Sequence, residues 1–178
     1  MNALGVTFVV ALGALAVVGA CDANPVHDND VAALGPEPSG SPGPEHRPGQ
    51  PCLVCHGGEG PASLQFSVGG TIYQSQSGAL VGQNGATVTM NDTNGTTATA
   101  TTNTVGNFYV LESQWTPTFP VHVDAVTYGD TTTDMITHIG RDGSCATCHS
   151  DPPGGDLVGH VYLAPGDEPD GGFAEGGP

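Results

Sequence analysis

The sequence predicts a mainly β protein: a single antiparallel β-sandwich with a short motif-bearing segment on either side of it. Three observations carry this prediction. Short stretches of the chain alternate between apolar and polar residues, which is the pattern of a strand with one buried face. These stretches are rich in valine and threonine, which favour strands over helices. Turns containing glycine and asparagine separate them at nearly regular intervals, as in sandwich folds.

The predicted strands all fall within residues 64–137. The two-residue alternation places them at residues 66–73, 86–90, 96–102, 107–111, 121–128 and 130–137. Turn sequences between them are Gln83-Asn84-Gly85, Asp92-Thr93-Asn94-Gly95 and Val105-Gly106-Asn107. Beyond this range, Gly159-His160-Val161-Tyr162-Leu163 is a candidate for a short closing strand.

The composition limits both the size of the folded part and its partners. At 178 residues the chain has room for one small domain plus tails, and its 28 glycines and 15 prolines indicate substantial unstructured chain. The chain has 18 Asp and Glu residues against 2 Lys and Arg, a formal net charge of −16. Nucleic-acid binding is excluded because it needs basic surface to neutralise phosphates. An acidic surface instead favours protein partners with basic docking surfaces.

The pentad Cys-x-x-Cys-His occurs twice, at residues 52–56 and 145–149. It is the attachment signature of c-type haem: each cysteine thiol forms a thioether to a haem vinyl group, and the histidine binds the iron from the proximal side. Two copies therefore predict two covalently attached c-type haems. The attaching thiols would be those of Cys52, Cys55, Cys145 and Cys148, and the proximal ligands His56 and His149.

Other uses of paired cysteines remain open at this stage. Two pairs can hold one zinc ion, but zinc ribbons separate their pairs by roughly 15–20 residues, whereas Cys55 and Cys145 are 90 positions apart. Each pair can also form a structural disulfide or a thioredoxin-like redox pair. Neither use needs the histidine that follows, and no βαβ pattern surrounds either pair.

The N-terminal segment is apolar and ends at a fifth cysteine. Residues 3–20 are apolar or small, and Val18-Gly19-Ala20 precede Cys21. This resembles a bacterial lipoprotein signal, although Met1-Asn2 lacks the basic n-region that such signals carry. The resemblance implies removal of residues 1–20, lipidation of Cys21 and an extracytoplasmic location tethered to the cell envelope, on the periplasmic side or the cell surface. A retained membrane anchor is the alternative, and the stretch is short for one.

The remaining boundaries follow from composition and from the motifs. Residues 21–48 are rich in Pro, Gly and acidic residues and predict a disordered linker. The first haem-binding segment spans residues 49–63 and the second spans residues 138–164, on either side of the sandwich. Residues 165–178 predict a disordered acidic tail.

Two resemblances to known families accompany these patterns. The order Gly70-Thr71-Ile72-Tyr73, Gly85-Ala86-Thr87-Val88 and Asp92-Thr93-Asn94-Gly95, followed by Gly106-Asn107-Phe108, resembles the carboxypeptidase-regulatory-like (transthyretin-like) sandwich, a structural module without catalytic residues. Over residues 48–164 the layout resembles small secreted bacterial dihaem c-type cytochromes, in which one haem motif precedes such a sandwich and another follows it. That resemblance implies a haem-maturation machinery outside the cytoplasmic membrane.

The sixth ligand of each iron decides what a haem does. A second His or a Met closes the iron and suits electron transfer, whereas an open position admits small oxidants. The expected distal ligands are His138, seven residues before Cys145, and His160, eleven residues after His149, with Met135 as the alternative. His46 and His122 rank behind them.

Arg141 is a cationic side chain beside the second motif. Arg141 is expected to pair with a haem propionate, since a guanidinium matches a carboxylate in charge and geometry. A surface salt bridge is the alternative. No acid–base constellation for a separate substrate is visible, so the sequence predicts an envelope-attached electron carrier that exchanges electrons with redox partner proteins. A small haem enzyme of peroxidase or oxyanion-reductase type, and a non-haem binding module braced by disulfides or zinc, are the alternatives.

Overall fold

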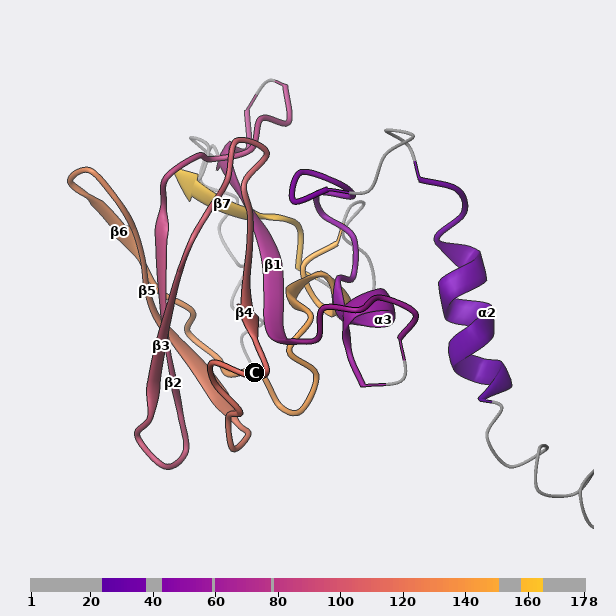
Figure 1. Cartoon of the computed structure of the whole chain (residues 1–178). Helices are drawn as coiled ribbons and strands as arrows, with labels where there is room; N and C mark the ends of the chain where they lie inside the picture. The colour runs from indigo at the N-terminus through magenta and orange to yellow at the C-terminus, as the bar shows by residue number, and fades with distance from the viewer. Residues whose placement is uncertain (1–23, 38–42, 59, 78, 151–157, 165–178) are drawn as a thin grey trace, which may run out of the picture. The chain divides into compact units, whose positions relative to one another are not determined.

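The chain divides into two compact units, residues 1–35 and 36–178. The structure is a computed structural model that describes residues 24–37, 43–58, 60–77, 79–150 and 158–164 (Figure 1). The predictions for the signal segment, for Cys21 and for the acidic tail lie outside these residues. No helix within the described ranges is long and apolar enough to cross a membrane.

The described part of the first unit is one helix, α2 (Pro25–Ala33). It lies within residues 21–48, the stretch whose composition predicts a disordered linker. The helix begins where two N-terminal signals coincide: the Asn24 side chain accepts a hydrogen bond from the backbone N–H of His27 (3.3 Å), and Pro25 occupies the first turn. None of its residues is buried.

The second unit is mainly β and contains two sheets, which confirms the predicted fold class at that level (Figure 1). One sheet has the strand order β4-β1-β7 and the other has the order β3-β2-β5-β6. The strands are β1 (Phe66–Ser75), β2 (Thr87–Asp92), β3 (Thr97–Thr101), β4 (Asn107–Leu111), β5 (Val121–Tyr128), β6 (Thr131–Thr133) and β7 (Val161–Ala164).

The core lies between the two sheets, and the sequence alternation selects the residues that enter it. In β2 every second residue is buried, and in β4 the buried residues are Phe108 and Val110. The largest fully buried side chains are those of Met90, Val68, Val88 and Val121. Alternation therefore fixes which face of each strand packs inward.

The first sheet departs from the predicted antiparallel arrangement. β1 pairs antiparallel with β4 but parallel with β7, with Ile72 opposite Val161. A parallel pair needs a long connection between its strands, and β2 to β6 lie between β1 and β7 in the sequence; the crossover from β6 to β7 is the last part of that connection. β7 falls on the candidate closing strand at residues 159–163, within the segment that also carries the second haem motif. β6 is also shorter than the predicted strand 130–137, and the chain regains pairing with β5 through the bridge between Ile139 and Val121.

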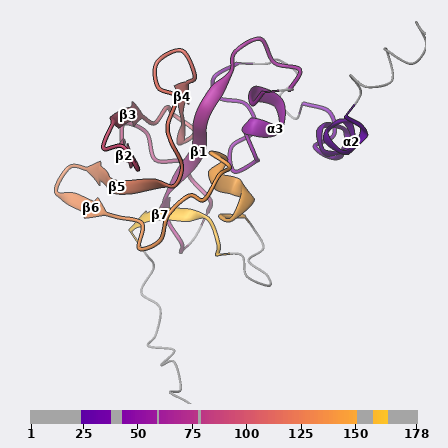
Figure 2. The same ribbon diagram turned by 90° about the horizontal axis from the view of Figure 1, so that it is seen from below.

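Both pentad motifs pack against β1. The first contributes α3 (Leu53–His56) and the second contributes the 3-10 turn η1 (Cys145–Thr147), and each contacts β1. Figure 2 shows α3 beside β1. β7 covers β1 only from Ile72 to Ser75, and further along the same edge β1 pairs with the residues leading into the second motif: Gly69 bridges Ser144, and the Gly69 N–H donates to the Gly143 carbonyl (3.0 Å).

Candidate functional site

The two pentads form the same backbone turn, although they are far apart in sequence. In the first, the Cys52 carbonyl accepts hydrogen bonds from the N–H groups of Cys55 (3.2 Å) and His56 (2.9 Å). In the second, the Cys145 carbonyl accepts from Cys148 (3.2 Å) and His149 (2.8 Å). One helical turn brings both cysteines and the histidine of a pentad together.

The histidine of each pentad is oriented in the same way. Nδ1 of His56 lies 2.9 Å from the Leu64 carbonyl oxygen, and Nδ1 of His149 lies 3.2 Å from the Gly159 carbonyl oxygen. When Nδ1–H of an imidazole donates to a backbone carbonyl, the ring is held in the tautomer in which Nε2 is unprotonated and has a free electron pair. This is the usual outer-shell arrangement of a metal-binding histidine.

The first cysteines of the two pentads meet β1 at consecutive glycines. A Cβ at Gly69 would lie 3.2 Å from Cys52 Cβ, and a Cβ at Gly70 would lie 2.7 Å from both Cβ and Sγ of Cys145. Glycine in a strand interior is typical of such a close approach. Because successive residues of a strand point to opposite faces, the two pentads approach β1 from its two faces. The sequence analysis missed this junction, and its one signal was the Gly-Gly pair within a predicted strand.

Cys52 and Cys145 are half-buried residues, and their thiols remain protonated at neutral pH. Burial raises the pKa of the Cys52 thiol to about 11. Burial also raises the pKa of the Cys145 thiol to about 12, and the neighbouring Cys52 thiol raises it further. A redox-active or metal-binding cysteine needs a lowered pKa and a thiolate, so neither thiol has the character of a thioredoxin-like nucleophile.

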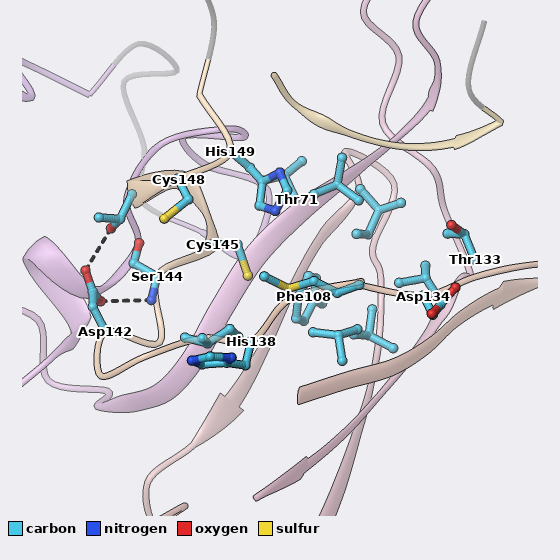
Figure 3. A pocket seen from close by; sticks show the side chains of 18 of the residues that line it. Thr71, Phe108, Thr133, Asp134, His138, Asp142, Ser144, Cys145, Cys148 and His149 are labelled. Carbon is cyan, nitrogen blue, oxygen red and sulfur yellow. Dashed lines mark hydrogen bonds between the residues drawn. The ribbon is translucent and has the colours of Figure 1, made fainter. Parts of the chain in front are cut away.

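An apolar cavity of about 350 Å³ opens beside the second pentad. It extends between the two sheets, and it lies within the size range of small-molecule and cofactor sites, about 300–1,000 Å³. Its apolar walls come from five strands and the crossover; they include Ile72, Val88, Phe108, Val123, Val126, Ile139 and Val161. Cys145, Cys148 and His149 also line it, so all three chemical groups of the second pentad face one apolar space (Figure 3).

The rim of the cavity is polar and is braced by Asp142. Its carboxylate accepts hydrogen bonds from the Ser144 N–H (2.9 Å) and the Thr147 hydroxyl (2.7 Å), the two dashed lines of Figure 3. The Ser144 hydroxyl is buried without a hydrogen-bond partner in the described chain. Arg141 lines the same cavity and makes no ion pair within the described ranges, whereas Arg47 is paired with Glu37 (3.0 Å). A ligand with acidic groups at one edge would satisfy both Arg141 and Ser144.

The surroundings of the first pentad are aromatic. The His56 ring stacks on Phe66, with centroids 4.1 Å apart and planes 3° apart, and Phe66 stacks in turn on the half-exposed Tyr109 (4.3 Å). The His46 ring is also near, with its centroid 5.7 Å from that of His56. The chain before the pentad is fastened to β1 by the Gly49 N–H, which donates to the Thr71 hydroxyl (2.8 Å).

The structure separates the candidate distal ligands. Met135 and His138 line the cavity together with His149, and Figure 3 shows His138 and His149 on either side of Cys145. His160 does not line that cavity; its ring lies against Tyr73 (4.7 Å between centroids) and beside Gly49. His122 is exposed and pairs with Asp124 (3.0 Å).

The residues around the second pentad fit a haem. All four described cysteines are free thiols. Within the described ranges no three His, Cys, Asp or Glu side chains gather as a metal ion would require, whereas covalent haem iron takes one or two protein ligands. Haem is a flat, mostly apolar macrocycle with two carboxylates on one side. The apolar cavity matches it, because Arg141 and the unpaired Ser144 hydroxyl lie at the edge of the cavity. The thiols of Cys145 and Cys148 and the oriented His149 ring lie beside it.

No family model, curated protein or solved structure matches this chain. The chemistry proposed for the site therefore rests on its own residues.

Proposed function

We propose that this protein is an envelope-attached dihaem c-type cytochrome that transfers electrons between redox partner proteins. The observation that carries the proposal is the duplicated geometry: two pentads with the same helical turn, each with its histidine Nδ1 on a backbone carbonyl and Nε2 free. Chance resemblance to a haem motif gives no reason for both histidines to be oriented in this way.

At the second site the chain supplies a complete set of groups. Cys145 and Cys148 would attach the haem, His149 would be its proximal ligand and His138 its distal ligand, with Met135 as the alternative. The apolar walls exclude water, which sets the potential of the iron. Arg141 neutralises a propionate and raises the potential of this haem relative to the same site without a cation.

At the first site Cys52 and Cys55 attach the haem and His56 is the proximal ligand. Phe66 holds the His56 ring on one face, so that the imidazole cannot rotate about its bond to the chain. A covalently held haem of this kind supplies a one-electron iron couple. The sandwich serves as the scaffold, in keeping with the resemblance to carboxypeptidase-regulatory-like modules.

The positions of the two pentads on β1 support rapid exchange between the haems. Cys52 and Cys145 contact consecutive residues of one strand, and the Cys52 thiol lies close enough to raise the pKa of Cys145. Thioethers at these sulfurs would place both macrocycle edges beside the same strand. The net charge of −16 would steer partners with basic docking surfaces. Lipidation of Cys21 would keep the carrier outside the cytoplasm and tethered to the envelope, where haem maturation takes place.

The test is to express the full chain with its signal and a haem-maturation system and to measure haem per protein by pyridine haemochrome. Two haems per chain with low-spin oxidised and reduced spectra support the electron carrier. The paired variants Cys52→Ala/Cys55→Ala and Cys145→Ala/Cys148→Ala should each retain one haem. A high-spin component in the wild-type protein would favour a haem enzyme with an open iron, and absence of covalent haem would refute the proposal.

A further inference from the structure

We infer that His46 is the distal ligand of the first haem, opposite His56, in place of either distal ligand that the sequence spacing favoured. The inference rests on the proposed function and deepens it, since it completes the ligand set of the first iron. His46 ranked behind His138 and His160 in the sequence analysis because it lies in a Pro- and Gly-rich stretch expected to be unstructured.

The first argument is distance. The His46 and His56 ring centroids are 5.7 Å apart and their planes are 27° apart. Two imidazoles that bind opposite sides of one iron through nitrogens at about 2.0 Å have ring centroids about 6 Å apart. The two rings are thus already held near the separation that a shared iron requires.

The second argument is orientation. Nδ1 of His46 lies against the backbone of Gly43, within 3.4 Å of its N–H and nearer to its carbonyl oxygen, and Nδ1 of His56 lies against the carbonyl of Leu64. The nearer contact, with the carbonyl, is the one that leaves Nε2 of His46 unprotonated. Both rings therefore have Nδ1 engaged by backbone and Nε2 left over, which is the arrangement of paired metal-binding histidines. Within the described residues, neither Nε2 has a hydrogen-bond partner.

The third argument is that the stretch carrying His46 is anchored. The Asn107 side-chain amide donates to the His46 carbonyl (2.9 Å), and the Asn103 amide donates to the Pro44 carbonyl (2.5 Å). The Thr104 hydroxyl donates to the Glu45 carboxylate. These bonds tie residues 44–46 to the turn before β4 and to its first residue, so the His46 backbone is held in place without any cofactor.

The fourth argument comes from the second pentad. His46 precedes Cys52 by six residues, and His138 precedes Cys145 by seven, so each pentad has a histidine at nearly the same upstream distance. His138 lines the cavity of its own pentad. A duplicated arrangement assigns to His46 the place at the first site that His138 holds at the second.

His160 is the rival ligand, because its ring also lies beside Gly49, in the first haem-binding segment. Its ring packs against Tyr73 at 4.7 Å and lies 6.4 Å from Tyr162, and these two tyrosines are paired across β1 and β7. Tyr73 is buried, so this packing alone accounts for the position of His160.

The experiment compares His46→Ala with His160→Gln and His122→Gln in the full chain, matured with haem as above. Haem per protein is measured first, and the spin state of the oxidised protein is then read by electron paramagnetic resonance. We expect His46→Ala to keep two haems and to convert half of the haem iron to high spin. Added imidazole should return that half to low spin. The two control variants should remain fully low spin.

Two outcomes overturn the inference while leaving the cytochrome intact: a fully low-spin His46→Ala protein with two haems, or conversion of half of the iron by His160→Gln. Wild-type protein without covalent haem would refute the proposed function itself. If His46→Ala instead retains only one haem, His46→Met decides. A low-spin first haem with a raised potential supports ligation by residue 46, because Met ligation raises the potential, and an unchanged potential contradicts it.

Discussion

Replacement of Gly70 by alanine tests the junction between the second pentad and β1. The new Cβ would lie 2.7 Å from Cβ and Sγ of Cys145 and 3.1 Å from the Phe108 ring, whereas ordinary van der Waals contact begins at 3.4 Å. The Cys145 backbone cannot retreat cheaply, because its carbonyl accepts two hydrogen bonds and its chain is paired with β1.

The change in the free energy of unfolding is the sum of two opposing contributions. Overpacking of a filled core costs about 1–3 kcal/mol, and alanine recovers about 0.5–1 kcal/mol by reducing the entropy of the unfolded chain. The net loss of unfolding free energy is about 1–2 kcal/mol, which lowers the melting temperature of a domain of this size by roughly 4–8 °C. Since Cys145 is displaced, haem attachment at the second site should also fall.

The assay is thermal unfolding of the haem-free protein, followed by haem content after maturation. Gly69→Ala is the graded comparison, because its Cβ would meet Cys52 Cβ at 3.2 Å and should cost less. Gly43→Ala is the matched control, with no atom within 4 Å of its added Cβ. A melting temperature for Gly70→Ala equal to that of Gly43→Ala, with two haems attached, would show that the close approach at β1 is wrong.

Three further changes have definite expected results. Arg141→Gln should lower the potential of one haem and leave the other unchanged, because loss of a cation favours the oxidised iron; an unaltered redox titration would rule out the propionate pairing. His138→Gln should turn half of the haem iron high spin, and a fully low-spin spectrum would point to Met135 as the distal ligand. Asp92→Asn should weaken folding at neutral pH and flatten acid denaturation below about pH 4, as followed by circular dichroism. Several hydrogen bonds, first among them the one from the Thr118 N–H, hold the pKa of Asp92 below its usual range. The ionised carboxylate therefore stabilises the fold, and that contribution is lost on acidification. An equal acid response in wild type and variant would contradict this.

The strands could be predicted where apolar side chains mark the buried face of the strand in the sequence. Val121, Val123 and Val126 point inward from β5, whose bounds match the predicted strand 121–128. β6 is shorter than predicted because the pairing with β5 ends at Thr133, whereas the sequence pattern interpreted as a strand runs on to residue 137. The α2 helix was missed because composition outweighed the local signals at Asn24 and Pro25.

The pentads were visible in the sequence, and what surrounds them was not. The contacts of Cys52 and Cys145 with Gly69 and Gly70 join segments that no local pattern relates, so only the folded chain brings them together. The same holds for His46, whose position depends on side chains of the turn before β4. A prediction from spacing assumes that residues close in sequence are also close in space. That assumption fails where a strand separates the residues that meet in the fold.

The parallel pairing of β7 with β1 sets an order of assembly. β7 follows the second pentad, so the strand that completes the first sheet is the last of the described strands to be synthesised. A chain delivered N-terminus first therefore presents all four thiols before its closing strand exists. Non-local pairing of this kind is also slow to form. The thiols therefore precede the docking of residues 161–164 beside Ile72 and Tyr73, which completes the first sheet.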